Sequence, residues 1–123
     1  MVQVPPFLLR RLYVKGSLRN TAEGIEFQLK NALGAGYAQE LLPLTIDGQE
    51  LSKEDCFFSL GDEPVPFSAV GEATPFTLAM NKVTTITVHG HHLEEGQHRI
   101  GMGFVVVGLG NMAFEVTDHV AEA

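Results

Sequence analysis

Residues 83–92 read VTTITVHGHH, and this stretch decides the fold. Successive side chains of an extended chain point to opposite faces, so Ile86 and Val88 share one face while Thr85 and Thr87 share the other. Branched residues in this alternation favour a strand with one face buried and one face in water. The stretch therefore predicts a β-strand whose apolar face is turned toward a core.

The same alternation continues on both sides of this stretch. Strands are predicted at residues 12–18, 25–30, 56–60, 100–106 and 112–116. Turn signals such as Asp47-Gly48 separate such segments, and the first two strands are expected to pair as a hairpin. About eight or nine short strands spaced in this way predict an all-β, antiparallel β-sandwich of Ig-like type. One such domain is expected to cover residues 1–123.

Two segments are less regular. Residues 37–46 contain Pro43, which cannot donate a ladder hydrogen bond, so an edge strand or a bulged strand is predicted there. A short helical turn over residues 38–42 is the alternative. After Asp118 the chain is expected to fray.

The charge balance bears on possible partners. Fifteen acidic residues outweigh eight Lys and Arg, which gives a formal net charge of −7. Such a field repels phosphate backbones, so nucleic-acid binding is not expected. Half of the bases nevertheless lie in the first nineteen residues, at Arg10, Arg11, Lys15 and Arg19. These four predict a basic edge that docks an acidic partner or a second copy of the chain, and a solvated strand face is the alternative.

Cysteine usage and hydropathy bear on the compartment. The single cysteine, Cys56, cannot form an internal disulfide, which fits a reducing, cytoplasmic environment. Its acidic neighbours would raise its pKa, so a small core residue is expected rather than a nucleophile. No apolar run approaches the roughly 20 residues needed to cross a bilayer, and the chain does not start with the apolar core of a signal peptide.

The densest group of chemically reactive side chains lies at residues 89–98, which read HGHHLEEGQH. Histidine and carboxylate are the usual ligands of a catalytic metal, and His89, His91 and Glu95 match the first half of a cupin-type metal motif. They are the candidate ligands if a divalent metal binds. If the apolar residues of this region face the core, however, His98 shares their face and lies opposite to His89 and His91. Ordinary side chains flanking a turn are therefore favoured, and no cofactor is expected.

Several stretches together resemble a known family. They are residues 12–20 (LYVKGSLRN), residues 24–31 (GIEFQLKN), Ile46-Asp47-Gly48, Leu93-x-x-Gly96-x-His98 and Phe114-x-Val116-x-Asp118. In these the chain resembles the small β subunit of the bacterial C-glycoside deglycosidases and the short uncharacterised proteins grouped with it. The resemblance implies a β-sandwich. It also implies a partner, because in that family the catalytic metal and its histidine base belong to a larger TIM-barrel α subunit, and no catalytic residue carries over to this chain.

The function expected from this resemblance is that of a non-catalytic accessory subunit of such a deglycosidase, or of a homo-oligomeric relative. In either case the chain would act by protein–protein association. Two alternatives stay open. One is a small, cupin-like, metal-dependent enzyme that uses His89, His91 and Glu95. The other is a carbohydrate-binding module, for which the lack of Trp and the presence of only Tyr13 and Tyr37 leave few stacking platforms.

Overall fold

Strands dominate the described chain, which comprises residues 5–33, 36–61 and 63–120 of a computed structural model. The eleven strands found there are β1 (Arg19–Asn20), β2 (Gly24–Lys30), β3 (Gly36–Leu41), β4 (Thr45–Ile46), β5 (Gln49–Glu50), β6 (Cys56–Ser59), β7 (Val65–Pro66), β8 (Phe76–Leu78), β9 (Val83–His89), β10 (Gly96–Val106) and β11 (Gly110–Val120). The helical elements are a short α-helix, α1 (Pro6–Leu9), and the 3-10 turns η1 (Arg10–Leu12), η2 (Lys53–Asp55) and η3 (Phe67–Ala69). No helix within these ranges is long and apolar enough to cross a membrane.

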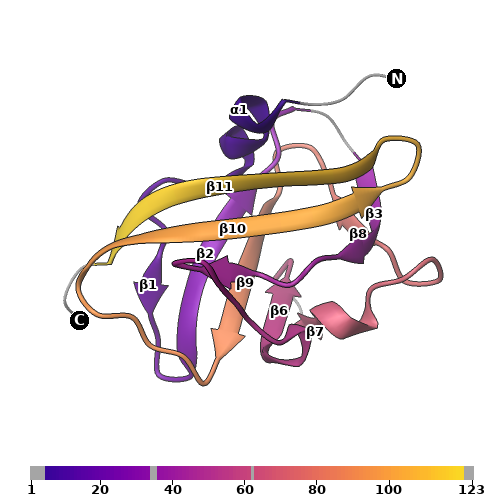
Figure 1. The fold of residues 1–123 in the computed structure, drawn as a ribbon. Coiled ribbons are helices and arrows are strands. Elements are labelled where there is room, and N and C mark those ends of the chain that lie inside the picture. Colours follow the sequence, from indigo (N-terminus) through magenta and orange to yellow (C-terminus); the bar gives the residue numbers. More distant parts are fainter. Residues whose placement is uncertain (1–4, 34–35, 62, 121–123) are drawn as a thin grey trace.

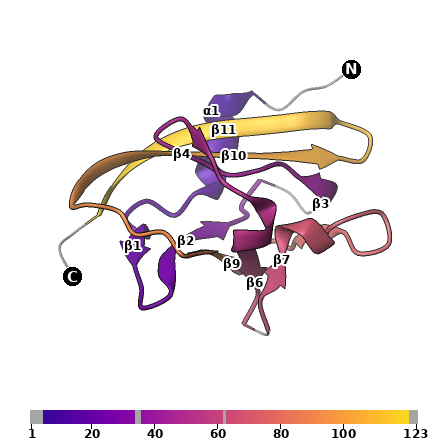
Figure 2. The same ribbon diagram turned by 60° about the horizontal axis from the view of Figure 1, so that its bottom comes forward.

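The strands form two sheets (Figure 1). One sheet has the order β1-β2-β9-β6-β7, and the other has the order β5-β4-β10-β3-β8, with β11 paired to β10. Figure 2 shows the two layers, with β10 and β11 running across one and β2, β9 and β6 in the other. Neighbouring strands are antiparallel, so the predicted all-β antiparallel sandwich is confirmed. Four of the strands have two residues each, which is why the count exceeds the predicted number.

Strand β9 confirms the alternation from which the fold was predicted. Thr84, Ile86 and Val88 are buried, and the residues between them are half-exposed. Strand β2 pairs with β9 along its whole length and repeats the pattern, with Phe27 completely buried. These apolar faces meet those of β10 and β11 in one core cluster. Burial of a side chain as large as Phe27 contributes roughly 1.5–3 kcal/mol to folding.

The prediction of a strand at residues 12–18 is wrong. Pro6 stands in the first turn of α1, where its missing N–H breaks no hydrogen bond, and the chain continues directly into η1. Leu9 and Leu12, three positions apart, are both buried from these helical turns. The predicted hairpin with β2 is reduced to the short strand β1 and an isolated bridge between Tyr13 and Leu29, and Gly16 turns the chain between them with a φ of 85°.

Pro43 falls in a gap between β3 and β4. Strand β3 is not an edge strand, because it lies between β10 and β8. It ends at Leu41, and the chain returns to the same partner, β10, when β4 begins at Thr45. The register shifts between Val105 and Val106 opposite β3, as in a β-bulge. The segment therefore contains a bulge, but between Ala38 and Glu40 rather than at Pro43, and the edge placement is wrong.

Strand β11 extends further than predicted. It continues past Asp118 to Val120, and both residues are buried. Residues 121–123 lie outside the described part of the chain. The strand pairs with β10 along its full length, and α1 and η1 lie along its other edge (Figure 1). Pairing with β10 as far as Val120, together with the burial of Val120, explains why the chain does not fray directly after Asp118.

Candidate functional site

The predicted metal ligands come from β9 and the loop that follows it. His89 lies on the outer face of β9, where its ring packs on Phe57 with the ring centroids 4.4 Å apart. Its Nε2 atom lies 3.2 Å from the Glu23 carboxylate. Gly90 then takes a φ of 80°, and the strand ends before His91.

The structure does not gather His89, His91 and Glu95 into one site. His91 is half-buried and Glu95 is exposed, both in the loop between β9 and β10. His92 is exposed, and its Nε2 lies 3.1 Å from the Thr21 carbonyl oxygen. In the described part of the chain, no group of three His, Cys, Asp or Glu lies close enough together to hold a metal ion. The metal set therefore stays a prediction without a preformed geometry.

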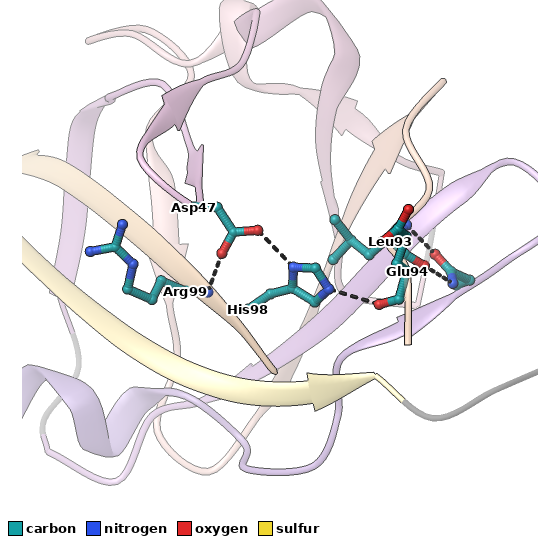
Figure 3. A network of polar contacts seen from close by, with 6 residues as sticks. Asp47, Leu93, Glu94, His98 and Arg99 are labelled. Atoms are coloured by element: carbon teal, nitrogen blue, oxygen red, sulfur yellow. Dashed lines mark hydrogen bonds and ion pairs between the residues drawn. The ribbon is translucent and has the colours of Figure 1, made fainter. Parts of the chain in front are cut away.

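Figure 3 shows a polar network in which His98 lies between Asp47 and Glu94. The Nδ1–H of His98 donates to Asp47 Oδ2 at 2.6 Å, and its Nε2–H donates to the Glu94 carbonyl at 2.7 Å. The other carboxylate oxygen of Asp47 accepts from the Arg99 N–H at 2.9 Å. The Asp47 carboxylate thereby joins the turn between β4 and β5 to the start of β10.

The protonation of His98 follows from these contacts. Both ring nitrogens face acceptors, so the imidazolium, which carries two N–H groups, satisfies them both. The hydrogen bond to Asp47, and then that to the Glu94 carbonyl, raise the pKa of His98 above its ordinary value of 6.5. The hydrogen bond from His98, followed by that from the Arg99 N–H, lowers the pKa of Asp47 below its ordinary value of 3.8. Oxygen acceptors engage both ring nitrogens of His98, and the network acts as a structural clamp.

The loop before β10 is also tied to β1. The Nδ2 of Asn20 donates to the Leu93 carbonyl at 2.8 Å, and the Leu93 N–H donates to Asn20 Oδ1 at 2.9 Å. On the other side of the clamp, Asp47 has a φ of 52° and Gly48 a φ of 85°, the paired left-handed conformations of a type I′ hairpin turn. The sequence identified this turn. The contact with His98 depends on the pairing of β4 with β10, which no sequence signal gives.

A second network, centred on Asp118, fixes the segment after η1 against β11. The Tyr13 hydroxyl donates to Asp118 Oδ2 at 2.6 Å, and the N–H groups of Gly16 and Leu18 donate to the same oxygen at 3.0 and 3.3 Å. Burial opposes the ionisation of Asp118, but these hydrogen bonds and that from the His119 N–H outweigh it and hold the pKa of the carboxyl below 3.8. Burial, and then the contact with Asp118, raises the pKa of Tyr13. The carboxylate therefore serves as a buried anchor.

The four predicted interface residues differ in their surroundings. Arg19 forms an ion pair with Glu26, with 2.8 Å between the guanidinium nitrogen and the carboxylate oxygen. Arg10 and Lys15 line one shallow hollow beside β11, where the Arg10 Nε–H donates to a backbone carbonyl of β11 at 2.9 Å. Arg11, next to Arg10 on η1, is exposed. Three of the four thus lie on the segment that the Asp118 network holds in place.

An apolar hollow of about 220 Å³ lies between the N-terminal helical turns and one of the two sheets. Its wall comes from α1, η1, β3, β8 and the hairpin of β10 and β11. Leu33 and Tyr37 belong to its lining and are 40% and 53% exposed. Sequence reasoning missed this hollow, because alternation shows that Phe104 faces inward but not where the sheet leaves a gap against α1 and η1. Tyr13, the other tyrosine considered for carbohydrate stacking, is buried.

A comparison with protein families bears on identity. Residues 8–121, nearly the whole chain, match the family model described as "Hydroxymethylglutaryl-CoA reductase, N-terminal domain". The chain belongs to this family. The resemblance to the small β subunit of the C-glycoside deglycosidases is therefore wrong. The motifs that suggested it mark strands and turns, such as the Asp47-Gly48 turn, which sandwich domains of unrelated families share. No curated protein matches the sequence.

In this chain, four side chains with shifted pKa values hold strands and loops together. Asp47 and His98 join a turn to a strand, and Asp118 and Tyr13 join the first segment to the last strand. Two other features are open to solvent, namely the basic residues beside β11 and the apolar hollow. These two are the candidates for contact with other molecules.

Proposed function

We propose that this chain is a non-catalytic accessory domain that docks on the catalytic part of a hydroxymethylglutaryl-CoA reductase. The family assignment supports this choice of partner, because the family is described as the N-terminal domain of that enzyme. The proposal includes a cytoplasmic location, which the free, buried Cys56 suits, since thiols persist in reducing compartments.

The observation that carries the proposal is a basic surface beside β11, where Arg10 and Lys15 line a shallow hollow together with Glu115, and where the exposed Arg11 follows Arg10 in the chain. It stands on a chain whose net charge is −7. The Asp118 network holds the backbone of the segment that bears these cations, so little backbone entropy is lost when a partner binds. Arg19 is left out of the basic surface, because it pairs with a carboxylate of β2. A fixed cluster of this kind suits an acidic patch on the partner, and the attraction weakens as salt rises.

Binding to the isolated catalytic domain of hydroxymethylglutaryl-CoA reductase from the same organism tests the proposal. Isothermal titration calorimetry should show a complex at about 50 mM salt that weakens at about 300 mM, because salt screens exposed charges. The double variant Arg11→Glu/Lys15→Glu should weaken binding roughly tenfold or more, since it replaces two attractions with two repulsions.

The matched control is Lys30→Glu/Lys82→Glu, which changes the net charge equally at two exposed lysines outside the basic surface. Its affinity for the catalytic domain should stay close to that of the unchanged protein. Equal weakening by both double variants, or no complex at low salt, would contradict the proposal. A dimer of this chain that dissociates on reversal of Arg11 and Lys15 would also contradict it, because a second copy would then occupy the basic surface.

A further inference from the structure

The apolar hollow lies where the sheet of β3, β8 and β10 passes α1 and η1. Leu9 and Leu12 line it from the helical turns, and Phe76 and Phe104 line it from the sheet. All four side chains are buried in the core cluster. The core therefore holds these walls in place before any ligand arrives, as in most small-molecule sites.

The chemistry of the lining is selective. None of the described residues that line the hollow is charged, and Asn31 supplies its amide group. The Nδ2 of Asn31 donates to the Leu78 carbonyl at 2.9 Å, and its Oδ1 accepts from the Leu33 N–H at 3.0 Å, so the amide helps to build the wall. A carboxylate or phosphate would lose its water here without gaining a cation, which is costly. The lining therefore selects a neutral, apolar occupant.

Size and access limit the occupant further. The volume of about 220 Å³ exceeds the roughly 150 Å³ of a cavity that accepts benzene. It is below the roughly 300 Å³ at which pockets for drug-sized ligands begin. The exposure of Leu33 and Tyr37 leaves apolar surface in water, and a ligand would cover it. We infer that the hollow binds one small, neutral, apolar molecule of the size of a substituted benzene ring or of naphthalene.

This site is separate from the proposed docking surface. The hollow and the shallow pocket at Arg10 and Lys15 share no lining residue. Loss of ligand binding in the hollow and loss of docking through the basic surface can therefore be observed independently. The uncharged lining also makes the hollow unsuitable for the phosphate groups of a coenzyme A ester.

Titration of the full chain with toluene, followed through leucine methyl signals in NMR spectra, tests the site. The signals of Leu33 and Leu109, which line the hollow, should shift and saturate. The signal of Leu60, which is exposed and lies outside the lining, should not move. Benzoate has the same ring with a negative charge and should bind at least about tenfold more weakly. Equal affinity for benzoate, or an equal shift at Leu60, would overturn the inference.

A blocking variant locates the ligand. Gly36 lines the hollow and shares the face of β3 on which Ala38 is buried, and an added Cβ there meets no atom within 4 Å. Gly36→Leu should therefore occupy the hollow and weaken toluene binding at least about tenfold. Gly71→Leu is the matched control, because a Cβ there also meets nothing within 4 Å and Gly71 lies outside the lining. If Gly36→Leu does not fold, Leu109→Trp narrows the hollow from the hairpin tip and should have the same effect, observed at Leu33. Unchanged affinity in a folded blocking variant would overturn the inference.

Discussion

Thr84 has a hydroxyl oxygen that is buried without a hydrogen-bond partner in the described part of the chain. Such a group costs roughly 1–3 kcal/mol. Thr84→Val keeps the shape of the side chain and removes the hydroxyl, so the free energy of unfolding should rise by about 1 kcal/mol in urea titrations. Thr87→Val, at a half-exposed position of the same strand, should change it by less than about 0.5 kcal/mol. A lower stability of Thr84→Val would show that the hydroxyl does have a partner.

Asp118 is the opposite case, a buried carboxylate with donors at both oxygens. Asp118→Asn removes the charge and turns an amide N–H₂ group toward some of these donors. We expect a loss of roughly 2–4 kcal/mol in the free energy of unfolding. Tyr13→Phe removes one donor and should cost less, about 1–2 kcal/mol. Urea titrations of both variants check the order, and a smaller loss for Asp118→Asn than for Tyr13→Phe would contradict this account of the anchor.

For single residues, the sequence predicts which face of a strand each side chain occupies, but it does not predict which distant residue that side chain contacts. Alternation correctly placed Phe27 and Ile86 inside, since it reports which side of a strand a residue occupies. Tyr13 and Asp118 are 105 positions apart, and no local pattern connects them. The strand pattern identifies Asp118 as the end of the last strand, but it does not predict that the carboxylate binds Tyr13, Gly16 and Leu18.

Among the elements, the turn between β4 and β5 depends on charge and hence on pH. The pKa of His98 is raised, so its contribution to stability is complete below 6.5 and is lost as pH rises through its folded-state value. The pKa of Asp47 is lowered, so its contribution is present above 3.8 and is lost as pH falls through its folded-state value. The contact between His98 and Asp47 should therefore stabilise the protein most between about pH 3.8 and pH 6.5, the ordinary pKa values of the two groups.

Asp47→Asn tests this clamp with little disturbance of the turn, because Asn also tolerates a positive φ and can still accept from the Arg99 N–H. The stability difference between the unchanged protein and this variant should be larger at about pH 5.5 than at about pH 9, because His98 loses its proton as pH rises. Urea titrations at both pH values measure it. A difference that does not depend on pH would show that the ion pair contributes nothing.

The long regular strands could be predicted, because a period of two sustained over β2, β9, β10 and β11 has no helical alternative. The segment at residues 12–18 misled for a physical reason. Its apolar residues fit a strand, but Gly16 takes a φ of 85° and turns the chain soon after the isolated bridge between Tyr13 and Leu29. Before this segment, Pro6 is a recognised helix-start signal, and Leu9 and Leu12 fit helical spacing. Greater weight on Pro6 would have found α1.

The opening of the whole sandwich can be measured through the reactivity of Cys56, which lies in the core that both sheets share. Burial raises the pKa of its thiol to about 11, as suits the core residue predicted from the sequence. A thiol reagent such as dithionitrobenzoate should therefore react when the sandwich opens. We expect slow labelling of the native protein, faster labelling of Asp118→Asn and slower labelling of Thr84→Val. Rapid labelling of the native protein would contradict the burial of this thiol.

The architecture could be predicted from the sequence, whereas the family could not. Alternation and turn signals define a sandwich, and sandwiches serve many unrelated families. The stretch Leu93-x-x-Gly96-x-His98, for example, marks the entry into β10 and the clamp on Asp47. It contributes to this fold whatever the partner is, so it could not separate one family from another.

The helical turns α1 and η1, which cover the free edge of β11, have a consequence for a cleaved form of the protein. On the side away from β10 the strand has no partner strand, and α1, η1 and the Arg10 side chain lie against that side. Trypsin could cut at the exposed Arg11 and release this cover. A bare strand recruits a strand from a neighbouring molecule, so nicked molecules should join into ribbons and precipitate while intact ones stay dispersed.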